Sequence, residues 1–549
     1  MLALGLVLGS IIIFYIAYNT YGTWLAKQWG IDATSQTPAH SKEDGIDFVP
    51  TKPQVLLGHH FASIAGAGPI NGPIVAAVFG WVPVLLWIVI GGIFFGGVHD
   101  YGSLTASMKH DGKSVGIIVE DYMGSTGKTL FSAFAWLTLI LVVAAFTSIV
   151  AKSFASTPAA ATASVLFMIE AIIFGYFVYR KGVSLTAATV VGVIVLFACI
   201  YVGTLIPLQL SETTWTIILA VYIFAASTAP VWILLQPRDY LNSFLLYTMM
   251  GGSVLGILIA RPTIQLAPFT GFKLVSASGA TKLLFPTLFI TVACGAISGF
   301  HSLVGSGTTS KQIDNEKDAK LIGYGGMLIE CALAVVALIT AAYLTKENYG
   351  EIMKNGPTVL FANGVADFMS KFGIPFEHGM NFVTLSVSAF ALTSLDTATR
   401  LARFIFQEFF EKNAGEGPQS VLTNKWVATT ITVVIGCVLA LKGYALIWPI
   451  FGSANQLLAA LALLAVASWL KADHKNYNMI VLPMIFMFAA TLSSLVIEVR
   501  NYFNLATTDG GAGNWIMTVL PIVLLVLAIV LVIEGYKTLV KNREPQKLA

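Results

Sequence analysis

The chain has 549 residues, of which 56% are hydrophobic and only 11% are charged, whereas an ordinary soluble domain carries roughly 25% charged residues. The formal net charge is only +3, and Lys and Arg are dispersed instead of forming a basic patch with interleaved aromatic residues. These values exclude a soluble enzyme and give no support for nucleic-acid binding.

Long apolar runs recur along the whole chain, beginning with residues 2–24, which lack the basic start of a signal peptide. Each run approaches the roughly 20 residues that a helix needs to cross the hydrocarbon of a membrane. Unpaired backbone groups are costly there, so spans of this length are expected to be helices. The runs predict fifteen transmembrane helices, near residues 2–24, 54–79, 82–108, 128–150, 160–180, 184–208, 213–236, 241–260, 282–305, 321–344, 380–400, 424–442, 446–470, 478–499 and 514–537.

The distribution of basic residues predicts the orientation of these helices. With the N-terminus outside and the C-terminus in the cytoplasm, 22 of the 31 Lys and Arg residues lie on the cytoplasmic side, as the positive-inside rule requires. If residues 54–98 made a single crossing, fourteen spans would result. The number of Lys and Arg residues on the cytoplasmic side would then fall to 19. We therefore predict an all-α polytopic protein of the inner membrane with about fifteen spans.

Two segments rich in Gly and Pro are predicted to interrupt helices at membrane depth, Gly58–Pro73 and Ala225–Pro230. They begin two blocks of five spans, 54–208 and 213–400, and an odd number of spans gives the blocks opposite orientations. Paired interruptions in inverted halves indicate a transporter site, although Gly and Pro are also common in membrane helices in general. The candidate substrate-binding residues are Ser63, Gly66, Gly68, Asn71, Ser227 and Thr228.

The remaining parts of the chain flank these two blocks. Residues 1–53 are predicted to form an extra N-terminal transmembrane helix and a cytoplasmic loop. Residues 401–549 are predicted to form additional C-terminal transmembrane helices and a basic tail.

Ionisable residues within predicted spans are costly and therefore candidates for function. Six of them are predicted to lie toward the cytoplasmic side, where they could form a proton relay because imidazole titrates near neutral pH: His59, His60, His99, Asp100, His301 and Asp396. A bound zinc ion is the alternative, with His59, His60, His99 and Asp100 as ligands, although no HxxxH spacing supports it. The histidines could also simply bind carbonyl groups that the glycines leave unpaired.

Asp396 and three further acids also have structural interpretations. Asp396 and Arg400 are four residues apart, the spacing of an ion pair on a helix. Glu170 and Glu330 are expected to form interhelical hydrogen bonds, with a role in transport as the alternative. Glu498 is close enough to a span end for its carboxylate to reach the interface.

No nucleophile–base pair, P-loop or dinucleotide-binding motif occurs in a suitable context, so we expect a protein that is not an enzyme. Transport would then be driven by an ion gradient, with protons favoured. Sodium is the alternative, because Ser306–Thr309 could offer oxygen ligands to a hard cation. A channel or a membrane-embedded starvation sensor is a less favoured class.

Four segments have sequences that are more specific than helix formation in a membrane requires. They are Gly58–Pro73, Ile297–Gln312, Thr393–Arg400 and Trp448–Ala459. Together they resemble the carbon starvation protein A family of bacterial and archaeal transporters, in its shorter form, up to about residue 470. The resemblance implies uptake of peptides during carbon starvation, or proton-coupled uptake of pyruvate. It also implies a core like that of the amino acid–polyamine–organocation superfamily, with ten helices in two inverted halves. The expected partners are thus a small-molecule substrate and membrane lipid.

Overall fold

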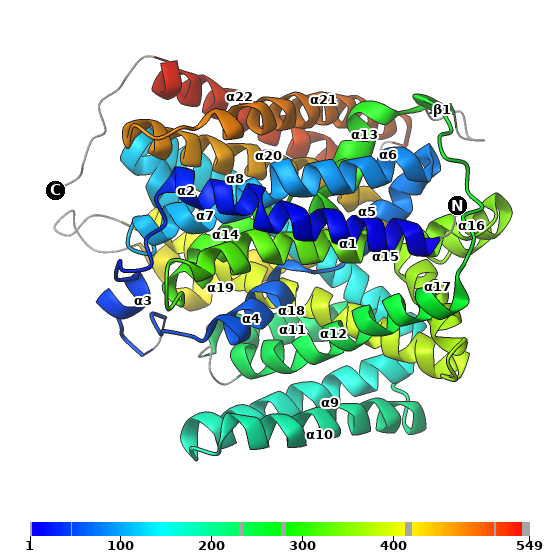
Figure 1. Cartoon of the computed structure of the whole chain (residues 1–549). Coiled ribbons are helices and arrows are strands. Elements are labelled where there is room, and N and C mark those ends of the chain that lie inside the picture. Colours follow the sequence, from blue (N-terminus) through cyan, green and yellow to red (C-terminus); the bar gives the residue numbers. More distant parts are fainter. Residues whose placement is uncertain are drawn as a thin grey trace.

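The computed structural model describes residues 3–45, 47–229, 234–275, 281–411, 420–509 and 512–540. Its long helices lie roughly along one direction, so the bundle has two ends (Figure 1). One end carries helix α3 (Pro38–Ser41) and is called the α3 end. The other carries an antiparallel pair of strands, β1 (Lys273–Val275) and β2 (Thr281–Leu283), and is called the hairpin end.

The other elements include short 3₁₀ or π-helical segments, which are labelled η. In chain order the elements are α1 (Ala3–Asn19), α2 (Tyr21–Trp29), α4 (Pro53–Ile64), α5 (Gly68–Ala76), η1 (Ala77–Phe79), α6 (Trp81–Leu86), η2 (Trp87–Gly96), α7 (Gly97–Lys109), α8 (Val115–Ser156), α9 (Pro158–Gly175), η3 (Tyr176–Arg180), α10 (Leu185–Leu205), α11 (Glu212–Thr228), α12 (Leu235–Ala260), α13 (Leu284–Thr291), η4 (Ala293–Gly295), α14 (Gly299–Gly307), η5 (Thr309–Lys311), η6 (Lys320–Gly325), α15 (Gly326–Ala342), α16 (Lys346–Met353), α17 (Pro357–Ser370), α18 (Phe376–Phe410), η7 (Val421–Thr423), α19 (Lys425–Ala440), α20 (Tyr444–Ala472), α21 (Asn478–Asp509) and α22 (Ala512–Val540).

The predicted fold class is confirmed, because the chain forms a helical membrane protein. In the described ranges, eleven helices are long and apolar enough to cross a membrane, and the bent pair α4–α5 makes up to twelve. The other three predicted spans correspond to the shorter helices α11 and α19 and to the interrupted helix α13–α14. Fifteen spans therefore stays a prediction, and the predicted basic tail lies mostly outside the described residues.

One predicted interruption is confirmed. Helix α4 ends at Ile64 and α5 begins at Gly68, with a bend of 48° between them. Ala65 leaves helical geometry with a ψ of 64°, and the Gly66 N–H donates to the Ile64 carbonyl at 2.8 Å. The small side chains of Ala65, Gly66 and Ala67 allow this turn within the bundle.

The second predicted interruption, Ala225–Pro230, stays a prediction. Residues 225–228 are the last turn of α11, and Pro230 lies outside the described residues. The second interrupted helix that the structure describes is α13–α14, where Ala296 and Ser298 have φ values of −135° and −141° and separate η4 from α14. Its sequence, Ala293-Cys294-Gly295-Ala296, contains one glycine and no proline, so the density of Gly and Pro did not indicate it.

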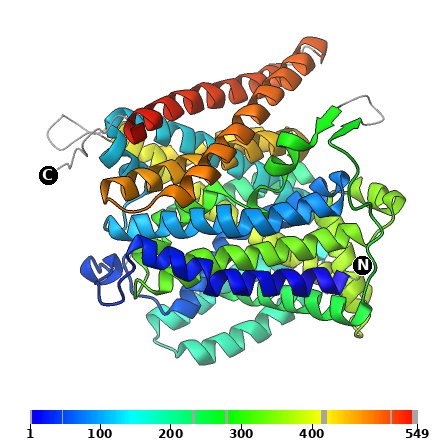
Figure 2. The same cartoon turned by 45° about the horizontal axis from the view of Figure 1, so that its top comes forward.

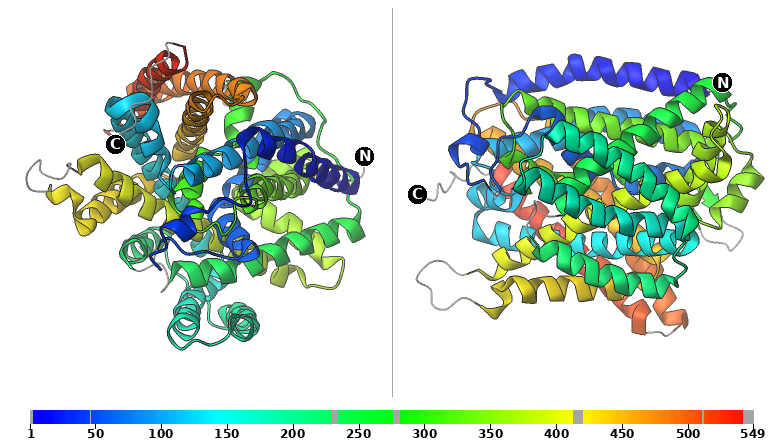
Figure 3. Two further views of the ribbon diagram at one scale, coloured as in Figure 1. Left: turned by 60° about the vertical axis from the view of Figure 1, so that its left-hand side comes forward. Right: turned by 90° about the horizontal axis from the view of Figure 1, so that it is seen from below.

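The two interrupted helices lie within the bundle. Helices α8 and α18 pack against each other, and α20 packs on α8. The α9–α10 pair lies apart on one flank (Figures 1 and 3), whereas α21 and α22 cover another flank (Figure 2). Helix α8 includes a sharp turn at Gly124, whose φ of +81° strongly favours glycine.

Candidate functional site

The two interruptions pack directly against each other. A methyl group added at Gly68 would lie 2.5 Å from Cys294 Sγ, and one at Gly72 would lie 2.6 Å from the Thr291 carbonyl oxygen. One at Gly66 would lie 2.8 Å from Ser394 Oγ on α18. These glycines therefore bring the interrupted helices together and onto α18.

Helix α20 satisfies the backbone groups that the second interruption leaves free. The Phe300 N–H donates to Asn455 Oδ1 at 2.8 Å, and Asn455 Nδ2 donates to Ser298 Oγ at 3.0 Å. Gln456 Nε2 donates to the Phe289 carbonyl at 3.1 Å. The Asn-Gln pair in the Trp448–Ala459 segment thus holds α13–α14 in its interrupted form, because buried backbone groups require partners.

A first buried group of ionisable residues joins α7, α14 and α15, and we call it the closed network: His99, Asp100, His301 and Glu330. Asp100 contacts two imidazoles at hydrogen-bond distance. Its Oδ1 lies 2.7 Å from His99 Nδ1, and its Oδ2 lies 2.7 Å from His301 Nδ1. His301 Nε2 lies 3.4 Å from Glu330 Oε2. The side chains of all four are fully or almost fully buried, and none lines the cavity described next.

A cavity of about 420 Å³ reaches into the bundle from the α3 end. Charged residues near that end line its outer part, including Asp47, Lys311 and Glu408. Its lining also includes His59 and Ser63 on α4, just before the first interruption. The cavity therefore leads from one end of the bundle to the interrupted helix α4–α5.

A second buried group lies beside His59, and we call it the cavity network: His59, Tyr222, Arg238, Asp239 and Asp396. Arg238 Nη2 donates to Asp239 Oδ1 at 2.8 Å, and Arg238 Nη1 is paired with Asp396 Oδ2. Tyr222 donates its hydroxyl to Asp396 Oδ2 at 2.7 Å and accepts from Arg238 Nη1 at 2.6 Å. His59 Nδ1 lies 3.5 Å from Asp239 Oδ2.

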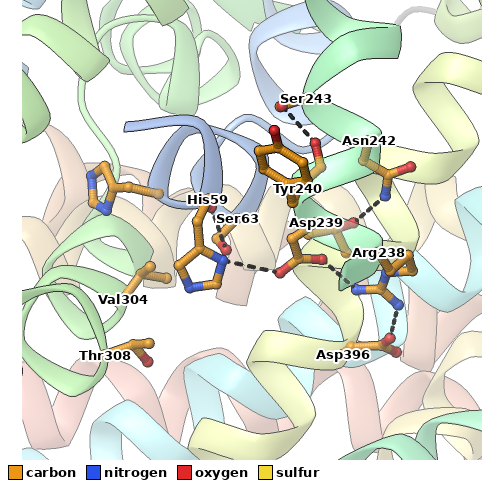
Figure 4. A network of polar contacts seen from close by, with 12 residues as sticks. His59, Ser63, Arg238, Asp239, Tyr240, Asn242, Ser243, Val304, Thr308 and Asp396 are labelled. Atoms are coloured by element: carbon orange, nitrogen blue, oxygen red, sulfur yellow. Dashed lines mark hydrogen bonds and ion pairs between the residues drawn. The ribbon is translucent and has the colours of Figure 1, made fainter. Parts of the chain in front are cut away.

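His59 lies between the other residues of this network and the cavity. Figure 4 shows its ring between the Asp239 carboxylate and the side chains of Val304 and Thr308, and the latter two residues line the cavity. The His59 side chain is 13% exposed, whereas that of Asp239 is fully buried. Of the five residues of the cavity network, His59 is thus the one that lines the cavity.

The predicted ion pair between Asp396 and Arg400 is wrong. Asp396 pairs with Arg238 on α12, whereas Arg400 Nη2 donates to the carbonyls of Ala226 and Ala229 at 2.8 and 2.5 Å. The spacing of four residues permitted a pair, but the last carbonyls of α11 lack helical partners and attract the guanidinium. Arg400 therefore caps α11.

The structure divides the six predicted proton-coupling residues. His99, Asp100 and His301 belong to the closed network, whereas His59 and Asp396 belong to the cavity network. His60 lies apart from both, with Nδ1 at 2.8 Å from Thr309 Oγ1. A single relay through all six is therefore not present as a chain of direct contacts.

The predicted substrate-binding residues are also dispersed. Ser63 lines the cavity, while Asn71 lines a separate cavity of about 50 Å³ with Lys152 and Thr358. Ser227 and Thr228 lie in the last turn of α11, near the guanidinium of Arg400. Gly66 and Gly68 pack against other helices, as described above, and do not line either cavity.

The described residues offer little for a bound cation. They contain no group of three or more His, Cys, Asp or Glu side chains that could hold a metal ion, so the zinc alternative finds no ligand set there. Ser306 Oγ donates to the Ser302 carbonyl at 2.7 Å, and Thr309 Oγ1 lies within hydrogen-bonding distance of His60. Two of the hydroxyls proposed for sodium, those of Ser306 and Thr309, thus have protein partners, whereas Thr308 lines the cavity.

The other predicted acids lie between helices. Glu330 contacts His301 on α14, and Glu170 accepts a weak contact from Cys199 on α10 at 3.9 Å. Glu498 was predicted to reach the interface, which is wrong. It is buried and accepts from Ser453 at 2.6 Å and from Ser494 at 3.0 Å, because these hydroxyls satisfy the carboxylate inside the bundle.

Sequence reasoning missed Arg238 and Asp239 as site residues. The predicted spans 213–236 and 241–260 leave Arg238 and Asp239 in the connection between them, with Pro237 just past the end of the first span. In the structure α12 begins at Leu235, and proline is well tolerated in the first turn of a helix. An adjacent Arg and Asp within the first turn of an apolar helix was the signal that could have identified them.

Comparison with known proteins gives a family, several relatives and a fold. The family model of carbon starvation protein CstA matches residues 2–355 and 350–494. The peptide transporter CstA of Bacillus subtilis is 32% identical, over 97% of this chain and 96% of that protein. The peptide transporter CstA of Escherichia coli is 34% identical, over 90% and 80%. The pyruvate/proton symporter BtsT of Escherichia coli is 31% identical, over 90% and 81%.

Solved structures are similar at the level of the fold. Two mutants of the Eremococcus coleocola manganese transporter match 90% of this chain and 99% of theirs. Their TM-scores are 0.51 and 0.50, with 13% and 14% sequence identity. At this level of sequence identity, the comparison shows a similar fold alone.

Proposed function

This chain belongs to the carbon starvation protein CstA family, and we propose that it is a secondary active transporter that carries a peptide or pyruvate together with protons. The observation that carries this proposal is the cavity that ends at the first interrupted helix, in front of a buried network of charged groups. Interrupted helices next to buried ionisable groups are typical of substrate and ion sites in transporters.

The size and lining of the cavity support a small polar substrate. Its volume of about 420 Å³ falls in the range of small-molecule sites, roughly 300–1,000 Å³. Either a dipeptide or pyruvate would fit, and both carry a carboxylate. The lining combines apolar side chains such as Leu303 and Leu401 with the charged groups of Lys311, Arg400 and Glu408.

We assign the α3 end to the cytoplasm and the hairpin end to the outside of the inner membrane. The basis is the excess of basic residues at the α3 end, which includes Lys109, Lys311 and Lys475. The described conformation would then be open to the cytoplasm. This orientation supports the predicted placement of the N-terminus outside and the C-terminus inside.

The division into inverted halves also belongs to the proposal, with a revised boundary. Helices α4–α5 and α13–α14 are the two interrupted helices, and they run in opposite directions, from the α3 end to the hairpin end and back. The second half is therefore better begun at residue 284 than at residue 213. The peripheral pair α9–α10 would then be an addition to the first half.

Uptake into proteoliposomes tests the transport proposal. Labelled pyruvate and a labelled dipeptide would be supplied outside vesicles with an imposed proton gradient, an imposed sodium gradient or neither. We expect one of the two solutes to accumulate with the proton gradient and not with sodium alone. Absence of uptake of both solutes would reject the proposal, as would a conductance far above the turnover of a carrier.

A further inference from the structure

The cavity network has spare hydrogen-bonding capacity although it is buried. Within the described residues, Arg238 Nε, Asp239 Oδ2 and Asp396 Oδ1 make no hydrogen bond. Buried polar groups are normally paired, and unpaired ones call for an explanation. The closed network also has unpaired atoms, on His99, His301 and Glu330, but none of its residues lines the cavity. The unpaired atoms around Arg238 lie beside the cavity and therefore indicate a site that is completed by another polar group.

Three helices bring the cavity to the edge of this network. His59 on α4 lines the cavity and faces Asp239. Leu235, one turn before Arg238 and Asp239 on α12, lines the cavity, as does Thr397, which follows Asp396 on α18. A ligand at the inner end of the cavity is therefore one side chain, that of His59, away from the guanidinium.

The two acids around Arg238 are held differently. Asp396 is bound by both Arg238 and Tyr222, on the side away from His59. Asp239 is held by Arg238 alone through Oδ1, and its Oδ2 faces His59 and the cavity. An incoming anion would therefore replace Asp239 more readily than Asp396.

The charge of the network determines what must accompany an anion. One guanidinium and two carboxylates give a formal charge of minus one. The other titratable groups beside it are Tyr222 on α11 and His59 on α4. Arg400 on α18 is the nearby cation, and its guanidinium is bound to the carbonyls of Ala226 and Ala229. A second uncompensated negative charge in a buried site is strongly unfavourable, whereas a carboxylate that enters with one proton leaves the charge unchanged.

We propose that Arg238 is the binding residue for the carboxylate of the substrate, which replaces Asp239 at Nη2, and that Asp239 takes one proton from the cavity side when this happens. The protonated Asp239 then donates from Oδ2 toward His59 Nδ1. Asp396 and Tyr222 keep Arg238 in place throughout. Asp239 has the role of proton carrier and His59 positions it. This inference rests on the proposed transport function and identifies the substrate group that the site recognises.

Binding to the detergent-solubilised full-length protein tests the inference. Titration calorimetry with pyruvate in two buffers of different ionisation enthalpy gives both the affinity and the number of protons taken up. We expect the wild type to take up about one proton per pyruvate and to bind the uncharged amide of pyruvate at least about 100-fold more weakly, the scale of an unpaired buried charge. If a dipeptide is the transported solute, the same comparison is made with it and its C-terminal amide.

Two variants separate the parts of the site. Arg238→Gln is expected to lose the preference for carboxylate over amide. Asp239→Asn, which keeps the pairing of Arg238 with Asp396, is expected to bind pyruvate without proton uptake. Glu170→Gln, in the peripheral α9–α10 pair, is the matched control with wild-type binding and proton uptake.

The outcomes distinguish this inference from the transport proposal. If neither solute enters wild-type proteoliposomes, the transport proposal fails. If the wild type transports one of them but Arg238→Gln keeps the carboxylate preference, or Asp239→Asn takes up a proton as the wild type does, this inference is overturned. Should Arg238→Gln not fold, the result for Asp239→Asn decides alone.

Discussion

The cavity network and the closed network are both buried, and both lie beside an interrupted helix, but they differ in access and in composition. His59 lines the cavity and contacts the buried Asp239, whereas Asp100 and His301 do not line it. The cavity network contains an arginine shared between two acids. The closed network alternates imidazoles and carboxylates at 2.7–3.4 Å.

This difference shows that burial of an ionisable group is not sufficient to assign it to transport. A proton or substrate site must exchange with each side of the membrane in turn, so it needs a path as well as a titratable group. In the described conformation only the cavity network has such a path. We therefore propose that the cavity network couples proton movement to substrate transport and that the closed network has a structural role.

The largest expected effect is on stability, from Asp100→Asn. Asp100 contacts two imidazoles, and removal of one partner of a buried ion pair costs about 3–5 kcal/mol. Thermal unfolding should shift strongly downward, and gradient-driven accumulation and downhill exchange should fall together. Asp367→Asn, which loses only a half-exposed pair with Lys371, is the control and should stay near wild type. Normal stability with loss of accumulation alone would move coupling to the closed network.

A smaller loss of stability is expected from Asn455→Ala. This change leaves the buried Phe300 N–H without its acceptor, which costs about 1–3 kcal/mol. It should also loosen α14, which carries His301 into the closed network. Gln456→Ala removes a bond to a less buried carbonyl and should cost less. Equal unfolding temperatures for Asn455→Ala and the wild type would show that α20 does not hold the second interruption.

Arg400→Gln is expected to weaken the end of α11 that supports Tyr222. The guanidinium caps two carbonyls of α11, and a charge at a helix C-terminus contributes about 0.3–1 kcal/mol, or up to about 2 where it is partly buried. Uptake should fall moderately, with an unchanged preference for carboxylate over amide. Loss of that preference would instead place Arg400, which also lines the cavity, in direct contact with substrate.

The smallest effect is expected from Glu170→Gln. Glu170 lies in an apolar groove between α9 and α10, with Cys199 as its neighbour and away from both networks. Uptake should match the wild type, and the free energy of unfolding should change by no more than about 0.5 kcal/mol. A clear loss of uptake would show that a third region takes part in transport and that the comparison of two networks is incomplete.

Much of the helical organisation could be predicted from the sequence, because hydrocarbon allows few structures other than long helices. The interruption at Ala65–Ala67 was also visible, since glycine and proline gather around it. The interruption at Ala293–Ser298 was not, because its irregular backbone is held by Asn455 and Gln456, more than 150 positions away along the chain.

The candidate site was only partly predictable for a related reason. The cost of ionisable groups in a membrane identified His59 and Asp396, but their partners are chosen by packing. Asp396 had Arg400 available one turn away and pairs instead with Arg238 from another helix. Local spacing shows which pairs are possible, whereas the arrangement of α11, α12 and α18 decides which ones form.

Simultaneous measurement of pyruvate and proton entry in proteoliposomes tests the central assignment most directly, with the dipeptide in place of pyruvate if it is the transported solute. In wild-type vesicles with an inward proton gradient, labelled pyruvate should accumulate and the interior should acidify in proportion. In Asp239→Asn vesicles we predict that pyruvate equilibrates across the membrane without accumulating and without acidification. Accumulation with wild-type acidification in Asp239→Asn would contradict the assignment of coupling to the cavity network.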